Sequence, residues 1–102
     1  MGHMARPTKL DRPEVDAWLS AHPGWQRHVE GDVEAIVRAF ALGDFGAALG
    51  FAVRLGMIAE KKDHHPDILI GWGKARVLWT THDAGGITRL DLDLAEATDS
   101  LV

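Results

Sequence analysis

The sequence predicts an α+β domain in which helices and strand pairs alternate as α-ββ-α-ββ-α. Three segments carry apolar residues at helical spacing, and two pairs of short apolar runs are each joined by turn residues. Two hairpins can form a four-stranded antiparallel sheet with the helices packed on one face. The other face of the sheet would then be free for solvent or a partner.

Length and composition indicate one small domain. The chain has 102 residues, which is enough for one modest core and too few for two. We assign residues 10–102 to this domain and residues 1–9 to a tag remnant and N-terminal tail, because Met1-Gly2-His3-Met4 resembles a vector remnant before a second start methionine. The net charge is −4 and Lys61-Lys62 is the only adjacent basic pair, so we expect no nucleic-acid partner.

The absence of cysteine excludes disulfides, thiol catalysis and thiolate metal sites. It is also consistent with a reducing cytosol. No apolar stretch reaches the roughly 18 residues that would span a bilayer, and no signal peptide is visible. We therefore expect a cytoplasmic protein with no membrane partner.

The first helix is predicted to begin near Asp11-Arg12-Pro13-Glu14. Asp11 is a suitable capping residue three positions before Glu14, and Pro13 lies in the first turn, where a missing N–H has no cost. Val15, Trp18 and Leu19 then share one face. His22-Pro23-Gly24 ends the helix.

The first hairpin is predicted from residues 25–29 and 33–42, which flank the turn residues Glu30-Gly31-Asp32. Asp44 is then a plausible N-cap for a long helix over residues 45–62. This helix is apolar on two sides, so we expect it to lie between layers or at a subunit interface. One side carries Phe45, Leu49, Ala52, Val53 and Gly56, and the other carries Phe51, Leu55 and Ile58.

Three glycines interrupt the long helix, although each costs roughly 1 kcal/mol of helix propensity relative to alanine. They are Gly46, Gly50 and Gly56. We expect them to allow close packing of the helix backbone against a flat surface such as a sheet.

The second hairpin is predicted from residues 68–72 and 75–81 around Gly73-Lys74, since Val77, Leu78 and Trp79 favour a strand. The last segment is ambiguous, because residues 89–94 alternate like a strand. Thr88-x-x-Asp91 is a capping-box pattern, and the following alanines favour helix. We therefore predict a C-terminal helix.

The histidines are the candidate functional residues. His64 and His65 precede Pro66, which favours an extended backbone at His65. Neighbouring side chains in an extended segment point to opposite sides, so this pair is poorly placed to bind one metal ion. His82 follows the last predicted strand, and it lies close to the pair if the long helix packs on the sheet. The three would then form the rim of a shallow pocket.

Three interpretations of this pattern remain open from the residues alone. A histidine-rich surface loop is the simplest, and proton transfer by imidazoles near neutral pH is the second. A zinc site built on His64, His82 and Asp91 is a weaker third. Asp91 is equally explained as the N3 residue of a helix cap, and Thr80-Thr81 as strand formers. No serine nucleophile or glycine-rich phosphate loop is evident.

The segment from Glu60 to Pro66 is followed by Trp72, His82 and Asp91 at spacings of five, nine and eight intervening residues. This arrangement resembles the pterin-4a-carbinolamine dehydratase family. The likeness covers roughly residues 10 to 101, and the family has the same α-ββ-α-ββ-α order. Further matches are Gly24-Trp25, Val29-Glu30-Gly31, Ala35-Ile36, Phe40, Asp44-Phe45, Gly50-Phe51 and Arg54.

The resemblance implies an enzyme that dehydrates 4a-hydroxytetrahydropterin to quinonoid dihydropterin and water, in tetrahydrobiopterin recycling. It implies acid–base catalysis with no metal and no organic cofactor. His64 and His65 correspond to the acid–base pair and His82 to the third histidine of the pocket. Asp91 corresponds to a conserved acid that orients an imidazole.

The resemblance also implies a set of substrate contacts and a quaternary structure. The pterin-contacting residues would be Glu60, Asp63, His64, His65, Trp72, Thr80, Thr81 and His82. Two positions depart from the family pattern: Ile68 stands where relatives often have an aromatic residue, and Trp72 replaces the commoner tyrosine. Family members form dimers and tetramers, so we expect a homodimer or homotetramer.

Similar folds also serve as protein-binding scaffolds, including a dimerisation cofactor of a liver homeodomain transcription factor and a Rubisco assembly chaperone. Fold alone does not decide between these functions. The histidine set favours the enzyme, because a scaffold has no physical reason to keep it.

Overall fold

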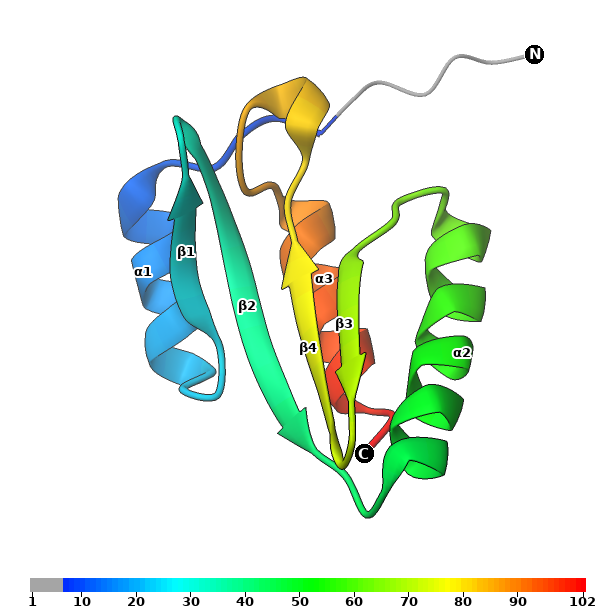
Figure 1. Cartoon of the computed structure of the whole chain (residues 1–102). Coiled ribbons are helices and arrows are strands. Elements are labelled where there is room, and N and C mark those ends of the chain that lie inside the picture. Colours follow the sequence, from blue (N-terminus) through cyan, green and yellow to red (C-terminus); the bar gives the residue numbers. More distant parts are fainter. Residues whose placement is uncertain (1–6) are drawn as a thin grey trace, which may run out of the picture.

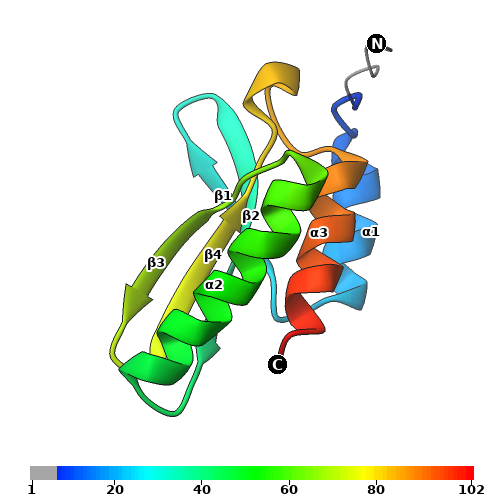
Figure 2. The same ribbon diagram turned by 90° about the vertical axis from the view of Figure 1, so that its right-hand side faces the viewer.

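The computed structural model describes residues 7–102, so the tag remnant expected at Met1–Met4 lies outside the described residues. One four-stranded sheet carries three helices on one face (Figures 1 and 2). The predicted α+β class and the order α-ββ-α-ββ-α are confirmed. The elements are α1 (Arg12–Ala21), β1 (Gln26–Glu30), β2 (Val33–Ala41), α2 (Phe45–Lys62), β3 (Asp67–Gly71), β4 (Lys74–Trp79), the 3-10 turn η1 (His82–Ala84) and α3 (Arg89–Asp99).

The sheet has the strand order β1-β2-β4-β3, and all neighbours are antiparallel. The two hairpins therefore join through β2 and β4, which occupy the centre. Alternation along the strands sends Ile36, Phe40, Val77 and Trp79 toward the helices, where all four are buried in the core. The opposite face, called the outer face below, is not covered by any of the helices in residues 7–102 (Figure 2).

Helix caps set the direction in which the chain enters and leaves each helix. The Asp11 side chain accepts a hydrogen bond from the Glu14 N–H, and Asp44 accepts one from the Ala47 N–H. Both predicted N-caps are confirmed. Helix α2 ends at Asp63, whose left-handed backbone (φ 51°) turns the chain from the helix toward His64.

Helix α2 is apolar on two sides, as predicted. Phe51 and Leu55 are fully buried against the sheet, whereas Val53 and Met57 are 58% and 69% exposed. Ala52 is buried with the first group, so its expected place beside Val53 was wrong. The exposed side, called the α2 stripe below, consists of Phe45, Leu49, Val53 and Met57.

Among residues 7–102, no helix is long and apolar enough to span a bilayer.

The expectation that the α2 glycines pack closely against the sheet was wrong. A Cβ atom at Gly56 would meet nothing within 4 Å, and one at Gly50 would meet only Arg54 of the same helix, at 3.4 Å. A Cβ at Gly46 would meet the capping Asp44 carboxylate at 3.5 Å. The buried side of the helix instead consists of Ala48, Phe51, Ala52, Leu55 and Ala59.

The second hairpin begins and ends earlier than predicted. Gly73 has a φ of +69°, so the turn is centred on Trp72-Gly73 rather than Gly73-Lys74. Strand β4 therefore ends at Trp79, and Thr81 pairs with Gly86 in an isolated bridge that encloses η1. Thr80 and Thr81 thus lie in the segment that leaves the sheet.

Candidate active site

His64 and Asp91 form a hydrogen-bonded pair that joins the segment after α2 to the first turn of α3. His64 Nε2 lies 2.6 Å from Asp91 Oδ1. The His64 side chain is 13% exposed, and the Asp91 side chain is fully buried. An ionised carboxylate only accepts hydrogen bonds, so Nε2 must carry the proton in this pair. Within the described residues Nδ1 has no hydrogen-bond partner, which leaves it available to a ligand.

The second oxygen of Asp91 fixes the carboxylate in place. Asp91 Oδ2 accepts hydrogen bonds from the Thr88 N–H at 2.9 Å and from the Thr81 hydroxyl at 2.7 Å. The Thr88 hydroxyl lies 2.9 Å from the Thr81 hydroxyl. Asp91 therefore caps α3 with one oxygen and holds His64 with the other, and the N-terminal end of the helix dipole favours its negative charge.

Trp79 supports the face of the His64 ring. The two rings are nearly parallel, at 12°, with centroids 5.6 Å apart. The Trp79 N–H donates to the Thr98 hydroxyl at 3.1 Å, and that hydroxyl donates to the Leu94 carbonyl at 2.6 Å. Asp91 near the start of α3 thus holds the edge of the His64 ring. Trp79, which is hydrogen-bonded to Thr98 near the end of α3, supports the face of the ring. Sequence reasoning treated Trp79 only as a strand former.

His65 has the opposite environment. Its Nε2 lies 2.8 Å from Glu60 Oε1, and the two side chains are 57% and 80% exposed. The rings of His64 and His65 therefore turn to different partners, one on α3 and one on α2. The extended backbone before Pro66 predicts this divergence.

The three histidines border one cavity of about 190 Å³ at the C-terminal ends of α2 and β4. Its lining contains most of the residues that the sequence singled out, together with Asp83, which the sequence did not single out. The lining residues are Asp63, His64, His65, Thr80, Thr81, His82 and Asp83. Glu60 reaches this group through His65, and Asp91 stands behind His64.

Trp72 is not brought to this cavity. It lies in the β3–β4 turn and is 75% exposed. This turn is at the opposite end of the sheet from η1 (Figure 1). The length of β3, roughly 16 Å for five residues, separates it from the segment that carries His65. We therefore leave Trp72 out of the site.

The described residues offer no ligand set for the zinc alternative. Among residues 7–102, no group of three histidine, aspartate or glutamate side chains is arranged to hold a metal ion. Asp91 in particular is already committed, because its two oxygens serve His64, Thr88 and Thr81. The arrangement instead provides proton donors and acceptors around a small open cavity.

The sequence model for "Pterin 4 alpha carbinolamine dehydratase" matches residues 8–101. A provisionally named pterin-4-alpha-carbinolamine dehydratase of Rhodopseudomonas palustris is 47% identical over 93 residues, covering 91% of this chain and 90% of the relative. One of Natronomonas pharaonis is 44% identical over 93 residues, covering 91% and 95%. The chain belongs to the pterin-4a-carbinolamine dehydratase family.

Two solved structures share the fold. A transcriptional coactivator/pterin dehydratase from Brucella melitensis is 36% identical and superposes with a TM-score of 0.83, covering 92% of this chain and 98% of that one. A pterin dehydratase-like protein identified as a RuBisCO assembly factor in the α-carboxysome is 19% identical, with a TM-score of 0.63 over 76% of this chain and 88% of its own. The second likeness shows the fold alone.

Proposed function

We propose that this protein is a 4a-hydroxytetrahydropterin dehydratase. In this reaction the 4a-hydroxyl accepts a proton and leaves as water, the N5 proton passes to a base, and a double bond forms between C4a and N5. Quinonoid dihydropterin is the second product, which places the enzyme in tetrahydrobiopterin recycling. One imidazole can donate a proton while another accepts one, each contributing roughly 10²–10⁴-fold to the rate.

The observation that carries this proposal is the grouping of three imidazoles around one cavity, with one of them fixed by a buried carboxylate. His64, held by Asp91 through Nε2, retains Nδ1 for exchange with a substrate. His65 and His82 are exposed and complete the catalytic set. Either of these two can take the step that His64 does not.

The polar groups of the cavity would bind the pterin ring. Asp63 and Thr80 line the cavity, and Glu60 lies beside His65. Thr81 also lines it, but its hydroxyl donates to Asp91, so we assign it a positioning role.

We place the reaction in the cytoplasm and infer no nucleic-acid or membrane partner, in line with the lack of cysteine and the net charge of −4.

Stopped-flow turnover of freshly prepared 4a-hydroxytetrahydropterin tests the proposal. We expect His64→Ala and His82→Ala to lower kcat/KM by about 10²–10⁴-fold relative to wild type. His22→Asn is the matched control, because His22 stacks on Trp18 at the C-terminal end of α1 and does not line the cavity. The enzyme proposal fails if the wild-type protein does not accelerate the reaction over buffer.

We further propose that the chain self-associates as a homodimer or homotetramer. The α2 stripe supports this, because its four large apolar side chains recur every four residues and are all at least 46% exposed. A row of exposed large apolar side chains on one helix is typical of an interaction surface. Gel filtration with light scattering should show an oligomer for wild type and a smaller species for Val53→Glu. Arg54→Glu, at the next position on the same helix, should remain oligomeric.

The same α2 stripe favours one alternative function, a non-catalytic protein-binding scaffold. A scaffold would bind a different protein through the stripe and would not depend on the histidines. A chain with no dehydratase activity that binds such a partner equally well as wild type and as His64→Ala would support this alternative. Wild-type turnover that is lost in His64→Ala would contradict it.

A further inference from the structure

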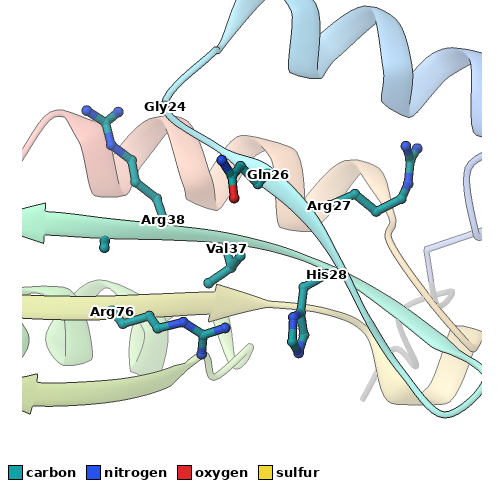
Figure 3. Close-up of a pocket in the computed structure, with 8 residues that line it drawn as sticks. Gly24, Gln26, Arg27, His28, Val37, Arg38 and Arg76 are labelled. Carbon is teal, nitrogen blue, oxygen red and sulfur yellow. The ribbon is translucent and has the colours of Figure 1, made fainter.

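The candidate site continues onto the outer face of the sheet. A cavity of about 250 Å³ shares Thr80 and His82 with the cavity of about 190 Å³ that the three histidines border, called the histidine cavity below. It also shares His28 with a third cavity, of about 360 Å³, at the far end (Figure 3). The three cavities therefore form one track that runs along β4 from His82 to Arg76, which we call the outer-face track.

The middle of the outer-face track is apolar at its base and acidic at its margin. Val33, Ala35 and Leu78 contribute apolar surface, and Ala35 and Leu78 are buried although none of the described helices covers this face. Glu30 and Asp67 also line this part. An aromatic or aliphatic group fits such a surface, whereas an anionic group would be repelled by the two carboxylates.

The far end has the opposite charge. Arg76 from β4 and His28 from β1 line it with Gln26, and Figure 3 shows the Arg76 side chain extending along β4 toward His28. No carboxylate is among the lining residues. In the described part of the chain, Arg76 has no ion-pair partner among the acidic residues.

The other two arginines at this end are already neutralised. Arg38 pairs with Asp99 at 3.0 Å. Arg27 pairs with Asp16 and Glu34. Burial opposes the charge of Arg27, but the hydrogen bonds to these two carboxylates more than offset it and raise its pKa. Arg76 is therefore the arginine of this cavity whose charge is left for a ligand.

We propose that the outer-face track binds the substituent of a pterin substrate that is aromatic near the ring and ends in carboxylates, as in an aminobenzoyl-glutamate tail of the folate type. The proposal rests on the proposed function, because the pterin ring occupies the histidine cavity. From Thr80 to Arg76 the track follows four residues of extended chain, roughly 13 Å. A three-carbon polyol is too short to reach Arg76, whereas an aryl amide of glutamate can do so.

Turnover of two carbinolamines tests this specificity. They are the 4a-hydroxy derivatives of 6-methyltetrahydropterin and of tetrahydrofolate, assayed with wild type and Arg76→Gln. We expect wild type to prefer the folate-type substrate through a KM about 3- to 5-fold lower, the range for an exposed charge pair. Arg76→Gln should abolish that preference and leave the methylpterin unchanged. Equal KM values for the two substrates in wild type would overturn the proposal. An equal rise of both KM values in Arg76→Gln would also overturn it.

Two controls sharpen the experiment. Arg54→Gln removes the same charge from α2, outside the outer-face track, and should keep the preference for the folate-type substrate.

A 4a-hydroxytetrahydropterin that bears a phosphate on a 6-hydroxymethyl group tests whether any anion lowers KM. We expect no gain for it, because its charge would lie near Glu30 and Asp67. A gain that depends on Arg76 would overturn the assignment to a carboxylate tail.

A binding measurement separates this inference from the proposed function. Titration of ¹⁵N-labelled protein with p-aminobenzoyl-glutamate alone should shift the amide signals of His28, Val37 and Arg76. The shifts should vanish in Arg76→Gln and persist in Arg54→Gln. If the shifts occur but neither carbinolamine is turned over, the dehydratase proposal is rejected and tail binding by the outer-face track is supported. If both carbinolamines are turned over but no shifts occur, tail binding by the track is rejected and the dehydratase proposal is supported.

Discussion

His64 and His65 are neighbours in sequence, yet they occupy opposite environments. His64 is 13% exposed and binds a carboxylate that is fully buried, whereas His65 is 57% exposed and binds one that is 80% exposed. Exposed pairs of this kind contribute roughly 0–1 kcal/mol, whereas a buried, hydrogen-bonded network holds its members in one geometry. The site thus combines one preorganised imidazole with one that solvent leaves free to move.

The difference originates in the local chain rather than in the two side chains. Asp63 adopts a left-handed backbone after α2, and Pro66 favours an extended backbone at His65. The first ring is thereby directed to the N-terminus of α3, and the second back along α2 to Glu60. Breaking each partner in turn should therefore have very different consequences.

Asp91→Asn should have the largest effect. The asparagine oxygen can still accept from Thr88 and Thr81, but its NH₂ group then faces His64 Nε2 and forces the proton of the ring to Nδ1. We expect kcat/KM to fall by about 10²–10⁴-fold, the range for loss of an acid–base group. ¹⁵N spectra of the imidazole should show the tautomer change.

Asp93→Asn is the matched control, since Asp93 lies on the same helix and makes an exposed pair with Arg89. It should keep wild-type turnover and the wild-type His64 tautomer. An Asp91→Asn protein with an unchanged tautomer and unchanged turnover would show that the buried pair has no part in the reaction.

Trp79→Leu should have the next largest effect. Loss of the indole leaves a cavity in the core and removes the surface against which the His64 ring lies. We expect unfolding free energy to fall by about 2–3 kcal/mol in urea denaturation, by analogy with other large-to-small core changes. A misplaced imidazole should lower kcat by about 10²-fold with little change in KM.

Trp79→Phe separates positioning from stability. Thr98 keeps its own bond to the Leu94 carbonyl when the indole N–H is lost, so phenylalanine leaves no unpaired hydroxyl. Its ring can still stack on His64 and should recover most of kcat. If leucine and phenylalanine give the same kcat, stacking does not position His64.

The sequence predicted the fold and the local part of the site because both depend on neighbouring residues. Asp11, Asp44 and the Thr88-x-x-Asp91 pattern predicted helix starts that the structure confirms. Asp91 was explained either as a cap or as an acid that orients an imidazole. The structure shows that its two oxygens serve both contacts at once, which one-dimensional spacing cannot reveal.

Contacts between distant segments could not be predicted in the same way. Trp79 at the end of β4 meets His64 only when α2 packs on the sheet, and no motif near either residue predicts their contact. Trp72 was included through family resemblance, but the two-residue turn at Gly73 holds it at the far end of the sheet. The outer-face track likewise depends on which strands are adjacent, β2 with β4, rather than on any motif.

Thr81→Val should have an intermediate effect. The change removes a hydroxyl that donates to Asp91 Oδ2 and contacts Thr88, while keeping the shape of the side chain. We expect a loss of about 1–2 kcal/mol of stability and a roughly tenfold fall in kcat. Ser100→Ala is the control, because it removes a hydroxyl that donates to the Glu96 carbonyl at the other end of α3. Comparable kcat values for the two variants would contradict the role of Thr81 in holding Asp91.

Glu60→Gln should have the smallest effect, since it removes an exposed charge from an exposed histidine. We expect less than about 0.5 kcal/mol of stability and less than about a threefold change in kcat/KM. Salt should mimic the substitution in wild type, because solvent-exposed charges are screened. A large loss in Glu60→Gln that 0.5 M salt does not reproduce would mean that substrate binding buries Glu60 and His65. The two histidines would then differ only in the free protein, and the second would become preorganised when the pterin binds.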